Sequence, residues 1–145
     1  MNTKIGTIFI MRGLPSVGKS TLSDVLKLVH PDSVVLSTDE FFVDKESNKF
    51  VFDKEKLLKA HEWNFSRFKK AIEDKKPNII VDNSNIKYFH YHHYLDYGQR
   101  HDYFVAIITI PHNDVSEQQL AERSSHGVTR NTIHRMKKEF QWEIK

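Results

Sequence analysis

The sequence has no cysteine among its 145 residues. Disulfide bonds, thiolate metal sites and cysteine nucleophiles are therefore excluded, and a metal ion would need oxygen or imidazole ligands. No apolar run approaches the roughly 20 residues that a membrane-spanning helix needs. The first residues lack a signal-peptide pattern, because the apolar stretch 5–11 is interrupted by Gly and Thr and has no small-residue cleavage site. We expect a cytoplasmic protein with no membrane segment.

Linker residues and charge of one sign are also scarce. The chain has only five Gly and four Pro, with no repeat and no low-complexity tract, so residues 1–145 are expected to form a single domain with a buried core. The formal net charge is +3 and the sequence pI is near 9.0. This mildly basic balance favours phosphate-bearing partners, but it equally fits a solvated surface, because Lys alternates with Asp and Glu. Nothing in the sequence predicts an oligomeric state.

Four apolar, β-branched runs alternate with helix-like segments. The runs cover residues 7–11, 33–37, 78–81 and 103–110. Such alternation is typical of parallel strands joined by crossover helices. The sequence therefore predicts an α/β fold of three layers, with a parallel sheet of about four strands flanked by helices and with a short helical lid near the end of the chain.

Apolar residues three or four positions apart predict the helices. One helix follows residue 18 and ends before Pro31, and others are expected over 54–75, with Asp53 as N-cap, over 116–124 and over 130–144. The side chains expected to face inward are Leu22, Val25, Leu26 and Val29 in the first helix, Leu57, Leu58, His61, Phe65, Phe68 and Ile72 in the second, and Ile133, Met136, Phe140 and Ile144 in the last.

Residues 13–20 read Gly-Leu-Pro-Ser-Val-Gly-Lys-Ser and lie between an apolar run and an amphipathic helix. This is the pattern of a phosphate loop, whose glycines let the backbone N–H groups at a helix N-terminus surround the phosphates of ATP. Lys19 would reach the β- and γ-phosphates, and the Ser20 hydroxyl would ligate Mg²⁺. The predicted nucleotide-binding residues are Gly13, Pro15, Ser16, Val17, Gly18, Lys19, Ser20 and Thr21.

Two acids follow the second and third apolar runs, where the carboxyl ends of parallel strands meet beside the phosphate loop. Phosphoryl transfer to an alcohol needs a carboxylate that takes the hydroxyl proton and a metal ion that neutralises charge. We expect Asp39 to be the general base rather than Glu40, whose side chain would point to the opposite side. Asp82 is expected to orient hydrated Mg²⁺. Either Asp could instead cap a helix or a turn, and the two could exchange roles.

Five stretches, in this order, resemble P-loop kinases of the phage polynucleotide kinase type. They are residues 11–21, 36–42, 60–67, 80–86 and 120–128, and together they extend over nearly the whole chain. The resemblance implies that Asp39 accepts the proton of a nucleic-acid 5′-hydroxyl and that Arg123, and secondarily Arg130, contact the donor phosphates. The other residues that it implies near the acceptor are Asn83, Asn85, His61 and Arg67.

The chain departs from this family just after Asp39. The prototype has an Arg there that holds the acceptor phosphate, whereas this sequence has Phe41 and Phe42. These aromatic residues could stack on a base of the acceptor, and Phe42 is our candidate. They could equally pack under the loop.

Arg123 precedes the segment 125–128, which contains Gly127 and is expected to act as a hinge. A mobile Arg can close over a γ-phosphate and exclude water, although Arg123 could also be a surface residue paired with Glu117 or Glu122. The His and Tyr residues of 88–94 predict an aromatic helix surface, with weak contact to nucleic acid as the alternative; no carboxylate or thiolate has zinc-like spacing around them.

Three functions remain open from the sequence. The first is a kinase acting on the 5′-hydroxyl of a nucleic acid, with Lys19, Asp39 and Arg123 as catalytic residues. The second is a kinase for a nucleoside, nucleotide or sugar, and the third is an NTP-binding switch module. Asp39 argues against the switch, because a switch needs no acceptor base.

Overall fold

Four parallel strands form one sheet in the computed structural model, which describes residues 3–142. The strands are β1 (Gly6–Arg12), β2 (Ser33–Leu36), β3 (Asn78–Asp82) and β4 (Tyr103–Thr109), in the order β2-β3-β1-β4. β1 is central, and its Ile10 is level with Val81 of β3 and with Ile107 of β4. The predicted α/β fold with a four-stranded parallel sheet is confirmed.

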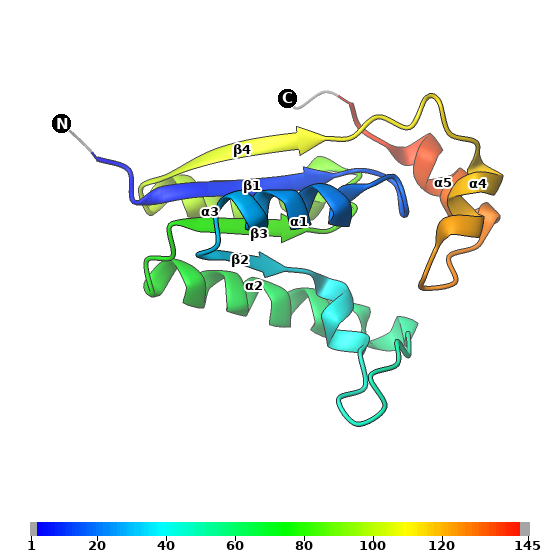
Figure 1. The fold of residues 1–145 in the computed structure, drawn as a ribbon, viewed down its shortest axis with the longest axis horizontal. Helices are drawn as coiled ribbons and strands as arrows, with labels where there is room; N and C mark the ends of the chain where they lie inside the picture. The colour runs from blue at the N-terminus through cyan, green and yellow to red at the C-terminus, as the bar shows by residue number, and fades with distance from the viewer. Residues whose placement is uncertain (1–2, 143–145) are drawn as a thin grey trace.

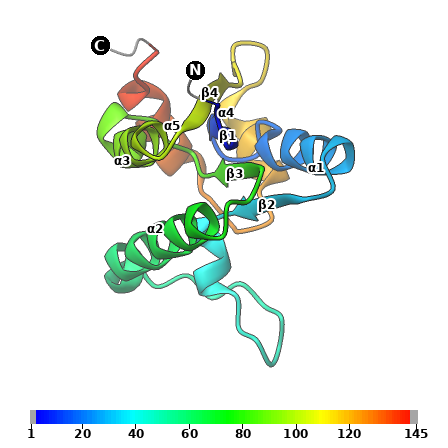
Figure 2. The same ribbon diagram turned by 90° about the vertical axis from the view of Figure 1, so that its left-hand side faces the viewer.

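Helices cover both faces of this sheet. Figure 2 shows α1 (Lys19–Val29) on one face, and α2 (Leu57–Glu73) with α3 (Tyr88–Arg100) on the other. Two further helices, α4 (Glu117–Arg123) and α5 (Arg130–Glu139), lie beyond the carboxyl ends of the strands (Figure 1). We call α4, α5 and the segment 124–129 between them the lid. Among residues 3–142, no helix is both long enough and apolar enough to cross a membrane.

Apolar side chains form two clusters that fix these layers. The larger one packs Ile8 and Ile10 of β1 against Phe68 of α2 and Tyr94 of α3. The smaller one lies under the lid, where Leu14, Ile86, Leu120, Ile133 and Phe140 are buried together. Because Leu14 belongs to the phosphate loop, the smaller cluster joins the lid directly to that loop.

The inward face of α1 matches the predicted apolar stripe only in part. Val25 and Val29 are 49% and 66% exposed, and the buried residues of α1 are Lys19 and Ser23. Residues four apart share a helix face, so the direction of Lys19 also determines the direction of Ser23. The other two residues of the stripe are half-buried on this face, and the prediction was wrong for Val25 and Val29 because the phosphate loop, rather than the apolar residues, sets the rotation of α1.

The first turn of α2 also differs from the prediction. A short 3₁₀ turn, Lys54–Lys56, precedes the helix, and Asp53 caps that turn by accepting a hydrogen bond from the N–H of Glu55. Leu57, Leu58 and His61 are exposed, whereas Ala60, Asn64 and Phe68 are buried. In Figure 1 this end of α2 extends past the end of β2, so its first turn has no sheet to pack against.

The last helix is shorter than expected and ends at Glu139. Ile133 faces inward as predicted, and Phe140 is buried just after the helix, where the chain is extended. Ile144, the last residue of the predicted stripe, lies outside the described residues.

Candidate active site

The phosphate loop joins β1 to the N-terminus of α1. Its Gly18 has a φ of 118°, in the left-handed region that favours glycine, and is the N-cap residue of α1. No side chain caps this helix and its first turn has no acidic residue. The first N–H groups of α1 therefore lack a side-chain partner and lie at the positive end of the helix dipole. This arrangement fits the binding of phosphate groups.

Lys19 lies between the loop and two acids. Its side chain is only 9% exposed, and Nζ donates to the carbonyls of Gly13 and Leu14, both at 2.9 Å. Burial lowers the pKa of Lys19 to about 8, and the nearby charges of Asp82 and Asp39 oppose this shift. The structure thus places the Lys19 ammonium against the loop and close enough to both acids for their charges to interact.

Ser20 and Asp82 are in direct contact. The Ser20 hydroxyl donates to Oδ2 of Asp82 at 3.2 Å. Burial raises the pKa of Asp82, while the charge of Lys19 and the hydrogen bond from Ser20 act to lower it. A hydroxyl and a carboxylate are oxygen ligands of the kind that Mg²⁺ prefers. These two side chains therefore fit a hydrated Mg²⁺ ion.

Asp39 follows β2 in a short 3₁₀ helix, Thr38–Phe42, whose N-cap is Ser37. Its side chain is 56% exposed, and one oxygen, Oδ2, lies 3.1 Å from Nδ1 of His126 in the lid. Glu40 turns away and forms an ion pair with Arg67 at 3.1 Å. Of the two adjacent acids, Asp39 is therefore the one whose charge acts on Lys19 and Asp82.

Two predicted acceptor residues, Asn83 and Asn85, hold backbone segments together. Oδ1 of Asn83 accepts a hydrogen bond from the N–H of Thr38 at 2.9 Å. Asn85 is buried, and its Nδ2 donates to the carbonyl of Met11 at 2.8 Å. This corrects the prediction for Asn85, whose side chain fixes the chain after β3 and does not face the acceptor side.

Arg67 and His61, on α2, lie beside the turn that carries Asp39. Besides its pairing with Glu40, the Arg67 guanidinium donates to the carbonyl of Ser37 at 3.2 Å. Because both bonds go to residues of this turn, Arg67 stabilises the turn. His61 is exposed, with Nδ1 3.4 Å from Oγ1 of Thr38. Partial desolvation lowers the pKa of His61, and Asp39 opposes this, which places His61 at the edge of the candidate site.

The side chain of Phe42 is buried, with 5% of its surface exposed. It packs against Phe41, Phe50 and Phe52, with ring centroids 5.0 to 6.1 Å away. The packing interpretation therefore holds for Phe42, which is not available to stack on a base in this structure. The accessible aromatic ring of this cluster is Phe52, which is 53% exposed.

Arg123 ends α4 and Arg130 begins α5, and both are exposed. Among residues 3–142, neither side chain forms a hydrogen bond or an ion pair. The alternative pairing of Arg123 with Glu117 is not found, because Oε2 of Glu117 lies 2.7 Å from Nδ1 of His134. Two unpaired arginines thus flank the segment 124–129.

Sequence reasoning missed the role of Arg12, the last residue of β1. Its side chain is fully buried, and its guanidinium donates to the carbonyls of Asn85, Ile86 and Gln141. The guanidinium also lies between two aromatic rings, 4.8 Å from the Tyr91 centroid and 4.7 Å from the Phe140 centroid. No local pattern marks this role, since all of these partners are distant in the sequence.

The His and Tyr residues at the start of α3 pack among aromatic rings. His92 stacks on Tyr88 with centroids 5.4 Å apart, and His93 meets the ring of Phe65 edge-on at 4.8 Å. Burial lowers the pKa of His93 to about 4. In the described part of the chain, no group of three or more His, Asp or Glu residues could hold a metal ion.

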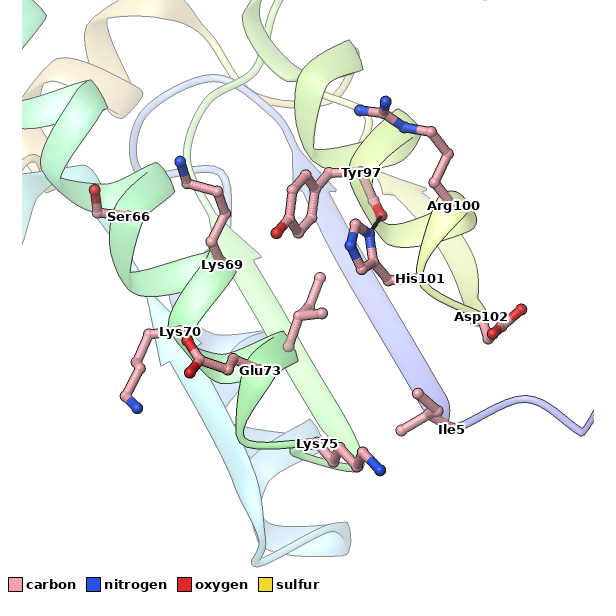
Figure 3. Close-up of a pocket in the computed structure, with 11 residues that line it drawn as sticks. Ile5, Ser66, Lys69, Lys70, Glu73, Lys75, Tyr97, Arg100, His101 and Asp102 are labelled. Carbon is pink, nitrogen blue, oxygen red and sulfur yellow. Dashed lines mark hydrogen bonds between the residues drawn. The ribbon is translucent and has the colours of Figure 1, made fainter.

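A groove of about 680 Å³ lies at the opposite end of the sheet from the phosphate loop. Figure 3 shows Lys69 of α2 on one side and Arg100 of α3 on the other, with Tyr97 stacked on His101 between them at 4.1 Å. Ile5 and Asp102, which precede β1 and β4, also line it. The groove is therefore separate from the candidate active site.

Comparison with known proteins agrees with this geometry. Residues 8–142 match the model of the AAA domain family. The chain is 37% identical over 136 residues to NEDD4-binding protein 2 of Homo sapiens, in an alignment that spans 92% of this chain but only 8% of that protein.

Two solved structures illustrate the likeness of fold. A chain of the Pnkp1/Rnl/Hen1 RNA repair complex has a TM-score of 0.69 and 13% identity, over 96% of this chain and 45% of that one. A gluconokinase from Sinorhizobium meliloti 1021 has a TM-score of 0.55 and 14% identity, over 96% of this chain and 77% of that one. At such identities the structures show the fold alone. The chain belongs to the AAA domain family and has the α/β fold of the P-loop kinases.

Proposed function

We propose that this domain is a magnesium-dependent kinase that transfers the γ-phosphate of ATP to the 5′-hydroxyl of a nucleic acid. The observation that carries the proposal is the position of Asp39, an exposed carboxylate at the end of β2 whose charge acts on the buried Lys19 and on Asp82. A group able to accept a proton thus adjoins a loop suited to phosphate. A nucleotide switch has no use for such a group, whereas a kinase requires one.

Each residue has a distinct part in the proposed transfer. Asp39 takes the proton of the acceptor hydroxyl, whose oxygen forms a bond to the γ-phosphorus as the bond from that phosphorus to the departing ADP oxygen breaks. Lys19 exchanges its bonds to the carbonyls of Gly13 and Leu14 for the β- and γ-phosphates. Arg123 closes over the transferred group from the lid, where its charge stabilises the charge that builds up there. Mg²⁺ held by Ser20 and Asp82 would neutralise charge on the phosphates.

The surroundings of Asp39 favour the end of a polymer as acceptor. Its carboxylate is open to solvent, and the neighbouring loop presents the exposed ring of Phe52. Exposed aromatic rings bind unpaired bases by stacking, with little dependence on sequence. The likeness to a chain of an RNA repair complex supports this choice, and the likeness to a gluconokinase supports a small-molecule acceptor as the second candidate.

The test uses γ-labelled ATP, Mg²⁺ and a panel of acceptors: 5′-hydroxyl DNA and RNA oligonucleotides, nucleosides, and gluconate. We expect label on the oligonucleotides. Asp39→Asn should lower kcat by about 10²- to 10⁴-fold, the contribution of a general base, and leave ATP affinity unchanged. Glu40→Gln is the matched control, because this adjacent carboxylate faces Arg67 instead of the site. Label on gluconate or nucleosides alone would contradict the nucleic-acid acceptor, and normal turnover in Asp39→Asn would contradict the base.

A further inference from the structure

The lid contacts the candidate base directly through His126. Nδ1 of His126 lies 3.1 Å from Oδ2 of Asp39. On its other side the imidazole stacks on Phe50, with centroids 3.9 Å apart and an interplanar angle of 12°. Two segments that are distant in the sequence, the loop 43–52 and the lid, therefore meet at Asp39.

The two stacked rings, Phe50 and His126, are each held by their own segment. Phe50 pairs with Val43 in an antiparallel bridge, and its ring lies 6.1 Å from that of the buried Phe42. On the lid side, Gly127 has a φ of 70°, which turns the chain sharply after His126. The N–H of Val128 then bonds to the Ser124 hydroxyl at 3.0 Å, closing the turn. The closed turn therefore fixes the position of the His126 imidazole, and the stacking on Phe50 fixes the orientation of its ring.

An exposed carboxylate needs such a partner to act as a base. The side chain of Asp39 is 56% exposed, so by itself it can adopt several rotamers, few of which direct an oxygen at the acceptor. The 3.1 Å contact of Nδ1 with Oδ2 restricts this rotamer and leaves Oδ1 to receive the acceptor proton. Lys19, Asp82 and His61 also interact with Asp39, but through charge only.

We propose that His126 is a positioning residue that orients Asp39 when the lid is closed. This inference rests on the proposed function, in which Asp39 is the base. Arg123 and Arg130 flank the same short segment, so the movement that brings them onto the donor phosphates also brings His126 onto the carboxylate. The donor contacts and the orientation of the base then depend on the same short segment, so phosphate transfer is linked to the position of the lid.

The kinetic test compares His126→Ala, His126→Asn and His134→Ala with the wild-type protein, with ATP and a 5′-hydroxyl oligonucleotide as substrates. We expect His126→Ala to lower kcat about tenfold or more, as misplacement of a catalytic group does, with KM for ATP unchanged. His126→Asn should recover much of the loss, because its amide nitrogen can occupy the position of Nδ1 and contact Oδ2 of Asp39. His134 is the matched control, a lid histidine beside Glu117 instead of Asp39.

Two outcomes of this comparison overturn the inference: an unchanged kcat in His126→Ala, or a His126→Asn protein no better than His126→Ala. Phe50→Ala gives a second check, since loss of the stacked ring should lower kcat in the same direction while KM for ATP stays constant. An unchanged kcat in Phe50→Ala contradicts the role given to the stacking.

A measurement without turnover separates this inference from the proposed function. In a ¹⁵N-histidine-labelled protein, the Nδ1 chemical shift of His126 should change in Asp39→Asn and stay constant in Asp24→Asn, which alters an exposed acid on α1. An unchanged shift in Asp39→Asn contradicts the contact alone. A wild-type protein that phosphorylates no 5′-hydroxyl contradicts the proposed function, whatever the chemical shift shows.

Discussion

Ser20 and Asp82 meet at the point where α1 begins and β3 ends, with 3.2 Å between the hydroxyl oxygen and Oδ2 of the carboxylate. This contact joins the phosphate loop to a second strand end. The two oxygen ligands proposed for Mg²⁺ are therefore already side by side in the protein.

The first prediction follows from this pair. Asp82→Asn should raise the Mg²⁺ concentration needed for half-maximal activity about 10- to 100-fold, the usual effect of losing a group that orients a metal and its waters. Because burial raises the pKa of Asp82, the Mg²⁺ concentration that the wild-type protein needs should begin to increase, as pH falls, at a higher pH than an ordinary Asp would give. A Mg²⁺ titration of activity tests both points, with Asp24→Asn as the control. An unchanged Mg²⁺ requirement would remove Asp82 from the metal site.

The second prediction concerns the proton on Lys19. With a pKa of about 8 in the free protein, most molecules carry a neutral Lys19 at about pH 8.5, whereas an ordinary Lys is charged there. The phosphates of ATP favour the charged form, so binding of Mg·ATP should take up most of a proton. Calorimetry in two buffers of different ionisation enthalpy measures this uptake. It should nearly vanish at about pH 6.5, where Lys19 already carries its proton. Equal binding heats in both buffers at the higher pH would contradict it.

The lowered pKa of Lys19 also affects the free energy of unfolding. The folded protein holds this proton less tightly than the unfolded chain, whose Lys has a pKa of about 10.4. Unfolding therefore takes up a proton between about pH 8 and pH 10.4, and the contribution of Lys19 to the free energy of unfolding rises with pH across that window.

The third prediction concerns Arg12. Arg12→Met removes the donor for the carbonyls of Asn85, Ile86 and Gln141 and should lower the free energy of unfolding by about 3 kcal/mol, since each buried carbonyl without a partner costs about 1 to 3 kcal/mol. Removing the buried charge offsets part of the sum. Urea denaturation is the measurement. Arg135→Met, on the exposed face of α5, should change the value by less than about 0.5 kcal/mol. Equal stability of Arg12→Met and wild type would show that the buried guanidinium is dispensable.

The fourth prediction concerns the exposed aromatic ring beside Asp39. Phe52→Ala should raise KM for a 5′-hydroxyl oligonucleotide about 5- to 100-fold, because stacking of one base contributes about 1 to 3 kcal/mol, and KM for ATP should stay constant. Phe104→Ala is the control, because Phe104 is similarly exposed but lies near the start of β4. If both variants bind the oligonucleotide equally well, Phe52 has no part in acceptor binding.

Structural features that depend on neighbouring residues in the sequence were predictable. The four strands follow from apolar runs, and the phosphate loop follows from residues 13–20, because in both cases neighbours in the sequence determine the structure. The positions of Asp39 and Asp82 followed from the general rule that parallel strands end at one edge. These parts of the fold and site needed no knowledge of distant contacts.

Features that depend on distant partners were not predictable. The rotation of α1 is set by Lys19 and its bonds to loop carbonyls, so the stripe of Val25 and Val29 faces outward. Asn85 and Phe42 have the chemistry of contact residues, but their hydrogen bonds and ring contacts to other segments bury them. The contact of His126 with Asp39 likewise joins two turns that are distant in the sequence, and the local sequence of neither turn predicts it.

Arg12 holds both ends of the lid segment at one place. Its carbonyl accepts a hydrogen bond from the N–H of Ile110 at 2.8 Å, where the chain leaves β4, and its guanidinium binds the carbonyl of Gln141, where the chain returns. Residues 111–140 therefore form a flap whose two ends both contact Arg12. Because the cost of closing a loop grows only slowly with its length, this flap can lengthen or shorten at little cost while its ends stay in place. A change in its length would move Arg123 and Arg130, whereas Asp39 and Asp82, which lie outside the flap, would stay at the ends of their strands.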